Sequence, residues 1–437
     1  RYIQAVLLFV GLFISYFLRI NISLAIVSMT DRYSSNINFH EFDWSEKEKS
    51  SILSSFFWGY SLVQIPAGQL GQYFSPKFVL VITNFIAAIF AALTPLAAYY
   101  GGWQLLCAIR VGQGLCQGFY VPLAFNIISK WVPSNEENRF VGFICSGVPL
   151  GAACALPLSG LLAESSGGWP SIFYVSGCLG IIWSILMAWL GADSPSTHST
   201  ITSFEKQYIE SFAVKDSINK ILKLKTPWKS ILTSLPYYSL LLVHLVSGLT
   251  YFFLVTEMPS YINSILKFDV RSNGFMSSIP YFSLWIFTFI VSWLADFLQA
   301  KGIISKNVER KLWTTFCTSG SGIALIIISF AGYNAVAVIA TFTIAVSCHA
   351  FLFSGFLMNH MDLAPNFTGV LVGIGNSAET VSAILAPLAV GLIVHNPKSV
   401  EEWRIVFIII AGLNAFGNII YVIFGSVKIQ SWNTPVE

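Results

Sequence analysis

Charged residues are scarce in this chain: Asp, Glu, Lys and Arg together make up 10% of its 437 residues. A soluble domain of ordinary composition carries about 25% charged residues. So few charges cannot cover a surface that faces water, and 55% of the residues are hydrophobic. Lipid is therefore expected to surround most of the chain. The net charge of +3 is too small to indicate a nucleic-acid partner.

The sequence also lacks the motifs of an enzyme or a metalloprotein. It contains no glycine-rich phosphate loop, no nucleophile elbow and no metal-ligand spacing. Its 7 cysteines lie in apolar stretches and form no CxxC pair, so they are expected to be packing residues. We therefore expect no enzymatic activity, no cofactor and no metal site.

What the chain has in abundance is long apolar runs. A helix that crosses a bilayer needs about 20 apolar residues, and the runs of that length predict an all-α membrane protein with twelve transmembrane helices in two pseudo-symmetric six-helix bundles. The predicted spans are 2–29, 50–73, 78–99, 103–131, 139–163, 169–191, 237–265, 273–299, 311–332, 334–358, 367–394 and 402–425.

The longest polar stretch divides the chain and predicts its organisation. Glycine and proline recur at matched places in spans five and eleven, which is typical of repeated bundles with a substrate site between them. The expected parts are an N-terminal bundle at 1–192, a cytoplasmic linker at 193–236 with amphipathic helices near Phe204–Phe212 and Val214–Leu224, a C-terminal bundle at 237–426 and a cytoplasmic tail at 427–437.

Lysine and arginine set the expected orientation. With a cytoplasmic N-terminus, 15 of the 24 Lys and Arg residues lie on the cytoplasmic side, 7 on the opposite side and two within spans. Both termini are therefore expected in the cytoplasm. The membrane is expected to be the plasma membrane or a lysosomal or vesicular membrane, and the protein is expected to be a monomer.

Two arginines lie inside predicted spans, where an ionisable side chain is costly and is therefore a candidate for function. Arg19 is in span one and Arg110 is in span four. Gln113, Gln117 and Tyr120 follow Arg110 along one helical stripe. A guanidinium group can hold a carboxylate or phosphate with two hydrogen bonds, so these residues predict a site for a small anion. Alternatively, each arginine pairs with a buried acid or with backbone carbonyls and holds helices together.

Acids and histidines within spans are candidates for coupling or gating. Glu379 is near the middle of span eleven with Asn376 nearby, and it could bind a proton or sodium ion or serve as a structural partner of an arginine. Glu257 in span seven is expected to be an interfacial or gate residue. His244 and Tyr251 share one face of span seven, where they either line the cavity or pack between helices.

At the inner end of span ten, His360 and Asp362 are expected to fix helix ends.

Several motifs carry a resemblance to a known group. They are Arg19-Ile-Asn21, Phe56-Phe-Trp-Gly-Tyr60, Gln64-Ile-Pro66, Arg110-x-x-Gln113-Gly-Leu-x-x-Gly118, Lys130-Trp-x-Pro133, Gly168-Trp-Pro170, Asn359-His-x-Asp-x-Ala-Pro365 and Trp403-x-x-Val-Phe407. The sequence resembles the anion-transporting branch of the major facilitator superfamily that includes sialin, the vesicular glutamate transporters and the type I sodium–phosphate cotransporters. It is most similar to invertebrate inorganic phosphate cotransporters of that branch.

The resemblance implies a secondary active transporter that binds a small anion and a coupling ion, sodium or proton, and works by alternating access. It also implies that Arg19 and Arg110 take part in anion transport and that Tyr60 faces the central cavity. A proton-coupled, sialin-like exporter of acidic sugars or acidic amino acids is the alternative, and an anion sensor that does not transport is a remote one.

Three positions depart from the pattern of the group. Proton-coupled members carry a glutamate where this chain has Gln117, and glutamate transporters carry a histidine and an arginine where it has Leu53 and Ser247. These departures argue against glutamate as the substrate, and they leave Glu379 as the acid that could take over proton coupling.

Overall fold

The computed structural model describes residues 1–31, 36–132, 137–198, 201–209 and 226–433, and all regular structure in these ranges is helical. The all-α prediction is confirmed. The chain forms two compact units, one of residues 1–22 and 55–223 and the other of residues 23–54 and 224–437. Helices α1 and α2 therefore each contribute to both units.

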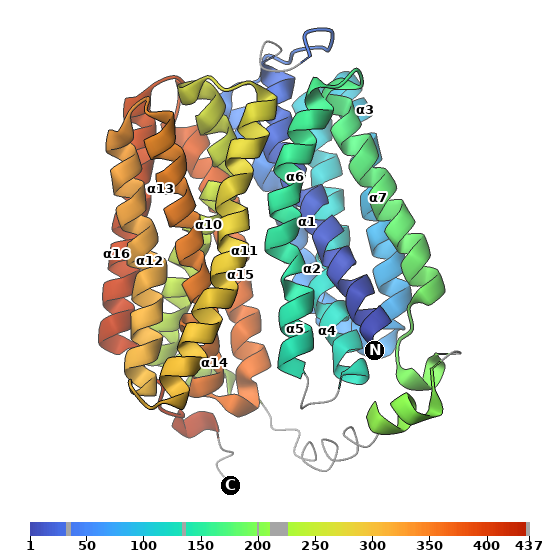
Figure 1. The fold of residues 1–437 in the computed structure, drawn as a ribbon, viewed down its shortest axis with the longest axis vertical. Coiled ribbons are helices and arrows are strands. Elements are labelled where there is room, and N and C mark those ends of the chain that lie inside the picture. Colours follow the sequence, from blue (N-terminus) through green and yellow to red (C-terminus); the bar gives the residue numbers. More distant parts are fainter. Residues whose placement is uncertain (32–35, 133–136, 199–200, 210–225, 434–437) are drawn as a thin grey trace. The chain divides into compact units, whose positions relative to one another are not determined.

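Helices α1 to α7 precede the linker (Figure 1). They are α1 (Tyr2–Thr30), α2 (Glu46–Tyr73), α3 (Pro76–Gln117), α4 (Tyr120–Trp131), α5 (Glu137–Cys145), α6 (Gly147–Glu164) and α7 (Gly168–Leu190). The second half contains α9 (Trp228–Ile231), α10 (Leu235–Leu266), α11 (Val270–Ala300), α12 (Lys306–Ala331), α13 (Ala335–Ser347), α14 (Phe356–Leu363), α15 (Thr368–Ile393) and α16 (Val400–Phe424).

The helices are long enough and apolar enough for a multi-pass membrane protein. Within the described residues, 10 helices meet the length and hydropathy of a membrane span. One of them, Pro76–Ile128, is 53 residues long, which is more than twice the length that one crossing requires. Helix α2 is not among the 10, and it begins with the charged run Glu46–Lys49.

Several predicted spans are interrupted, and glycine or proline marks the interruptions. The break between spans three and four is a kink inside α3, where Gly102 has a φ of 57° that a residue with a Cβ rarely adopts. Span four stops at Gln117 and restarts as α4, and span five stops at Cys145 and restarts as α6. Pro122 and Pro149 fall in the first turns of α4 and α6, where a missing backbone N–H costs nothing.

Span ten is also divided, into α13, a 3₁₀ turn at Cys348–Leu352 and α14, and it continues to Leu363 instead of ending at 358. In the linker, residues 203–209 are helical. The remainder of the two predicted amphipathic helices lies in 210–225, outside the described residues.

The segment after α16 packs against the turn between α14 and α15. The backbone N–H of Gln430 donates to the Leu363 carbonyl at 2.9 Å. Asn433 accepts from the N–H of Asn366 through its side chain and from the Asn366 side chain through its carbonyl, both at 3.0 Å. Residues as far as Asn433 are therefore held by the fold.

Candidate functional site

Arg110 lies inside the first unit and joins α3 to α1. Its side chain is buried, with 1% exposed. Nη1 donates to Gln113 Oε1 at 2.8 Å, and Nη2 donates to the backbone carbonyl of Arg19 at 3.1 Å. A third, longer contact of 3.4 Å runs from Nη1 to the carbonyl of Leu18. The alternative of pairing with backbone carbonyls is therefore present for Arg110, and the arginine fixes the stretch of α1 that carries Arg19.

Arg19 is enclosed by aromatic rings. Its guanidinium carbon is 4.4 Å from the ring centroid of Tyr16, 4.6 Å from that of Tyr60 and 4.9 Å from that of Phe56. Such contacts attract a cation to the ring faces. The guanidinium carbon of Arg110 is 5.0 Å from the same Phe56 ring. The two arginines predicted from the sequence are thus brought together, with Tyr60, around one phenylalanine.

The surroundings of Arg110 are short of negative charge in the described residues. Among the residues that the structure describes, no carboxylate is within ion-pairing distance of Arg110. Its Nε is buried and has no hydrogen-bond partner in those residues. A buried charge without a counterion is unfavourable. An anion that reaches the pair would therefore be stabilised electrostatically.

Close contact between α2 and α3 positions the rings against the arginines. A Cβ on Gly114 of α3 would overlap the backbone carbonyl of Phe56 on α2, and one on Gly59 would overlap the carbonyl of Val111. The two helix backbones therefore touch, which only glycine permits. This contact sets Phe56 and Tyr60 beside the guanidinium groups.

The remaining residues of the predicted stripe bind α1 at other levels. Gln117 Oε1 accepts from the Ser15 hydroxyl at 3.0 Å, one helical turn from Arg19. The Tyr120 hydroxyl donates to the Leu8 carbonyl at 3.1 Å, and its ring packs against Trp183. Neither of these hydrogen bonds involves an arginine, so substrate binding by Gln117 and Tyr120 stays a prediction.

The predicted residues of the second unit lie on α10 and α15. Glu257 is 4% exposed, and its Oε1 has no hydrogen-bond partner in the described part of the chain. Glu379 packs against α10, because its Cγ lies 2.9 Å from the place where a Cβ of Gly248 would stand. Asn376, one turn earlier on α15, is partly exposed. The coupling roles of the two glutamates stay predictions.

His244 and Tyr251 contact other histidines. His244 Nε2 is 2.9 Å from His360 Nε2, and the Tyr251 ring packs against His349 with centroids 5.5 Å apart. Sequence reasoning missed the first pair, because His244 and His360 are 116 residues apart and nothing in their local sequence links them. Asp362, expected to fix a helix end, binds Arg310 at 2.8 Å and Lys306 at 2.6 Å.

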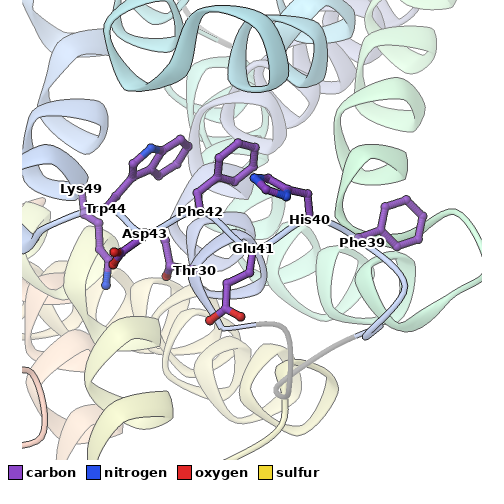
Figure 2. Close-up of a pocket in the computed structure, with 8 residues that line it drawn as sticks. All are labelled: Thr30, Phe39, His40, Glu41, Phe42, Asp43, Trp44 and Lys49. Carbon is purple, nitrogen blue, oxygen red and sulfur yellow. The ribbon is translucent and has the colours of Figure 1, made fainter.

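A separate cavity of about 580 Å³ lies in the second unit beside the segment that joins α1 to α2 (Figure 2). The lining residues are Thr30, Phe39, His40, Glu41, Phe42, Asp43, Trp44 and Lys49. None of the predicted site residues is among them. The only cation in this lining, Lys49, forms an ion pair with Glu46 at 2.7 Å, so the cavity does not resemble an anion site.

The sequence of residues 8–387 matches the family model described as Major Facilitator Superfamily. A protein from Drosophila melanogaster named "Putative inorganic phosphate cotransporter" is 37% identical over all of this chain and 87% of its own length. Sialin from Ovis aries is 33% identical over 99% of this chain and 90% of its own length. Vesicular glutamate transporter 2 from Homo sapiens is 33% identical over 100% of this chain and 76% of its own length.

Solved structures with the same fold are more distant in sequence. A bacterial homolog of the human lysosomal transporter Spinster superposes with a TM-score of 0.71 at 14% identity, covering 96% of both chains. A D-xylose–proton symporter superposes with a TM-score of 0.71 at 15% identity, covering 98% of this chain and 99% of its own. These similarities confirm the fold, and the relatives that share the sequence are transporters and not enzymes.

Proposed function

Because the chain belongs to the Major Facilitator Superfamily, we propose that it is a secondary active transporter of a small organic or inorganic anion. It works by alternating access and is driven by a sodium or proton gradient or by the membrane potential. The observation that carries the proposal is the arginine pair, in which Arg19 and Arg110 are buried within 5.0 Å of one phenylalanine ring.

The two arginines have different roles in this proposal. The Nη groups of Arg110 donate hydrogen bonds to Gln113 and to the backbone of α1. Arg110 therefore positions Arg19 and adds positive charge. Arg19 contacts aromatic ring faces, and the N–H donors of a guanidinium lie along its edges in a planar fork that matches the oxygens of a carboxylate or phosphate. Arg19 is therefore the direct ligand of the substrate, with Tyr60 beside it.

Inorganic phosphate is the first substrate to test, since a relative that is 37% identical carries that name. Gln117 and Ser247 stand where related glutamate transporters carry an acid and an arginine, which makes glutamate a poorer candidate. An exporter of acidic sugars or acidic amino acids, like sialin, is the alternative, because sialin is 33% identical over nearly the whole chain.

The test is uptake of labelled anions by the purified full chain in liposomes. The panel contains inorganic phosphate, sialic acid and glutamate, each under imposed sodium, proton and potential gradients. We expect uptake of at least one anion, its loss in Arg19→Ala and little rescue in Arg19→Lys. Arg271→Ala is the matched control, because Arg271 is exposed in the first turn of α11.

The outcome separates the candidates. Uptake of sialic acid without phosphate supports the sialin-like alternative, and binding of an anion without any flux supports the remote alternative of a sensor. Full uptake by Arg19→Ala would refute the arginine site.

The topology is also a proposal. We propose twelve spans, in bundles at 1–192 and 237–426, and cytoplasmic termini in a monomer of the plasma membrane or of a lysosomal or vesicular membrane. The distribution of Lys and Arg supports this orientation. A C-terminal epitope that antibodies reach in intact cells would contradict it.

A further inference from the structure

Two histidines of the second unit form a buried pair that the arginine site does not use. His244 of α10 and His360 of α14 are 2% and 0% exposed. Their Nε2 atoms are 2.9 Å apart, and their ring centroids are 4.9 Å apart. At this distance the two nitrogens share a hydrogen bond, so one of them carries the proton and the other accepts it.

The other contacts of His244 decide which ring donates. His244 also forms a hydrogen bond with the backbone of Gly375 on α15. A neutral imidazole has only one N–H. Because His244 donates that N–H to the Gly375 carbonyl, its Nε2 carries no proton and can only accept a hydrogen bond. The N–H between the rings therefore belongs to His360. In a neutral His360 whose Nε2 is protonated, Nδ1 is the bare nitrogen.

His360 Nδ1 is buried and has no hydrogen-bond partner among the residues that the structure describes. A buried polar atom without a partner is rare in folded proteins and calls for an explanation. Here the atom is a base, since a bare imidazole nitrogen can accept a proton. It is attached to a ring whose other nitrogen already donates to a second imidazole.

The rings packed against the pair can accommodate a positive charge. Phe356 lies 4.7 Å from His244 in an edge-to-face arrangement, and Tyr237 lies 6.2 Å from His360. Tyr237 donates its hydroxyl to the Leu371 carbonyl, so it presents an aromatic ring to His360. Aromatic rings of Phe356 and Tyr237 therefore border the pair.

The charged groups of the neighbouring helices are engaged elsewhere. On α14, Asp362 is bound by Arg310 of α12, at 2.8 Å, and by Lys306. On α16, the Tyr421 hydroxyl accepts from Asn359 at 2.7 Å. On α15, Glu379 packs at Gly248, one turn along α10 from His244.

His349 of the preceding 3₁₀ turn contacts the backbone carbonyls of Ser247 and Ala345 through its two ring nitrogens. In the described residues no carboxylate forms an ion pair with His244 or His360.

We propose that the His244–His360 pair is a proton-binding site that couples transport to a proton gradient, with His360 Nδ1 as the atom that accepts the proton. The inference rests on the proposed function as an anion transporter. The step forms one N–H bond at Nδ1 from a proton of the aqueous phase, and release to the other aqueous phase breaks it. The Nε2–H···Nε2 bond is retained and shares the positive charge between the two rings.

Gln117 of the predicted stripe is an amide and cannot take up a proton at physiological pH. Helix α14 is held on two sides, because it is bonded to α12 through Asp362 and Arg310 and to α16 through Asn359. Protonation of His360 therefore changes the charge at a point where α10, α14 and α15 meet.

The first experiment needs no substrate. Nitrogen NMR of the full chain with ¹⁵N-labelled histidine follows each imidazole nitrogen from roughly pH 5 to 8, where histidine ordinarily titrates. A coupling between two Nε2 nuclei across the hydrogen bond identifies the pair in the unmodified protein. We expect His360 Nδ1 to change from a bare to a protonated nitrogen in this range. If Nδ1 is already protonated at pH 8 or stays bare at pH 5, the proposal is overturned.

The second experiment measures coupling in liposomes loaded with purified protein, at zero membrane potential and with labelled inorganic phosphate. One proton moved with each anion lets a gradient of one pH unit support about tenfold accumulation. We expect His360→Gln to lose this response, with the accumulation ratio near one. His244→Gln keeps a hydrogen bond to His360, because an amide accepts and donates, but it removes the ring that shares the charge, so we expect coupling to shift to lower pH.

His349→Gln is the matched control, a buried histidine of the same unit whose nitrogens contact backbone carbonyls, and it should retain the tenfold response. Full coupling in His360→Gln would overturn the proposal even if the NMR result were positive. If the unmodified protein takes up neither phosphate nor another anion of the panel, the proposed function fails, and the NMR titration still decides whether the proton site exists.

Discussion

Replacing Arg19 with glutamine should weaken anion binding strongly, whereas its effect on the stability of the empty protein should be partly offset by relieved charge repulsion. The guanidinium carbons of Arg19 and Arg110 are 4.9 and 5.0 Å from the centroid of the Phe56 ring, so they lie no more than about 10 Å apart. With an effective dielectric constant of about 20, two like charges at that distance repel each other by at least about 1.7 kcal/mol. The glutamine variant loses this repulsion.

The same substitution also removes favourable contacts. Arg19 lies over three aromatic rings, and each such contact contributes about 0.5 to 1 kcal/mol at an exposed site and up to about 2 kcal/mol when desolvated. The loss and the relieved repulsion oppose each other. The three contacts sum to at most about 6 kcal/mol, and the relieved repulsion offsets at least about 1.7 kcal/mol of that loss, so we expect the free energy of unfolding of the empty protein to fall by no more than about 4 kcal/mol.

The loss of the contact between Arg19 and the anion is not offset by any relieved repulsion. A hydrogen bond to a charged group contributes about 1.5 to 3 kcal/mol, which corresponds to about 10- to 150-fold in the dissociation constant. The assay is thermal unfolding of the purified protein with and without the transported anion, together with the anion concentration that gives half-maximal uptake. Arg404→Gln is the control, because Arg404 stacks on Phe330 at 5.4 Å and donates to the Ser329 carbonyl.

Two results would refute the reasoning. If the glutamine variant at position 19 binds the anion as tightly as the unmodified protein, the arginine does not contact it. If the empty variant loses far more than about 4 kcal/mol of its free energy of unfolding, Arg19 is mainly a structural residue.

Three further substitutions test other parts of the argument. In Gly114→Ala the new Cβ overlaps the Phe56 carbonyl, so we expect about 1 to 3 kcal/mol of destabilisation in a denaturation experiment and reduced uptake. The control is Gly412→Ala, where nothing lies within 4 Å of the new Cβ, and it should change neither the stability nor the uptake. Gln117→Glu should introduce a pH dependence of uptake, with weaker anion affinity at neutral pH because the new carboxylate competes for the arginines; parallel pH profiles of the two proteins would contradict this. Glu379→Gln should alter the dependence on the driving ion more than the anion affinity, and unchanged responses to all imposed gradients would make Glu379 structural.

The sequence was sufficient for the fold class and for the arginine pair, for physical reasons. An apolar run of span length indicates a membrane helix by its length and composition alone. A charged residue inside such a run can be identified without any knowledge of packing. The interruptions at Gln117 and Cys145 were not predicted, because a hydropathy pattern continues across a break in which both sides stay apolar.

Contacts between distant segments could not be predicted in the same way. That Phe56 lies near both Arg19 and Arg110 depends on the glycine contact between α2 and α3, which is a property of packed backbones. The bond between His244 and His360 depends in turn on the approach of α14 to α10. The sequence showed two isolated histidines, whereas the structure places their Nε2 atoms 2.9 Å apart.

The packing of the segment after α16 has a practical consequence for handling the protein. Gln430 and Asn433 are bonded to the turn between α14 and α15, and the Trp432 ring lies 6.3 Å from that of Phe367. Affinity tags and fluorescent fusions should therefore be attached beyond residue 433. Trimming the chain at the end of α16, where hydropathy alone would place the boundary, would strip hydrogen bonds from the turn and is expected to lower the yield of folded protein.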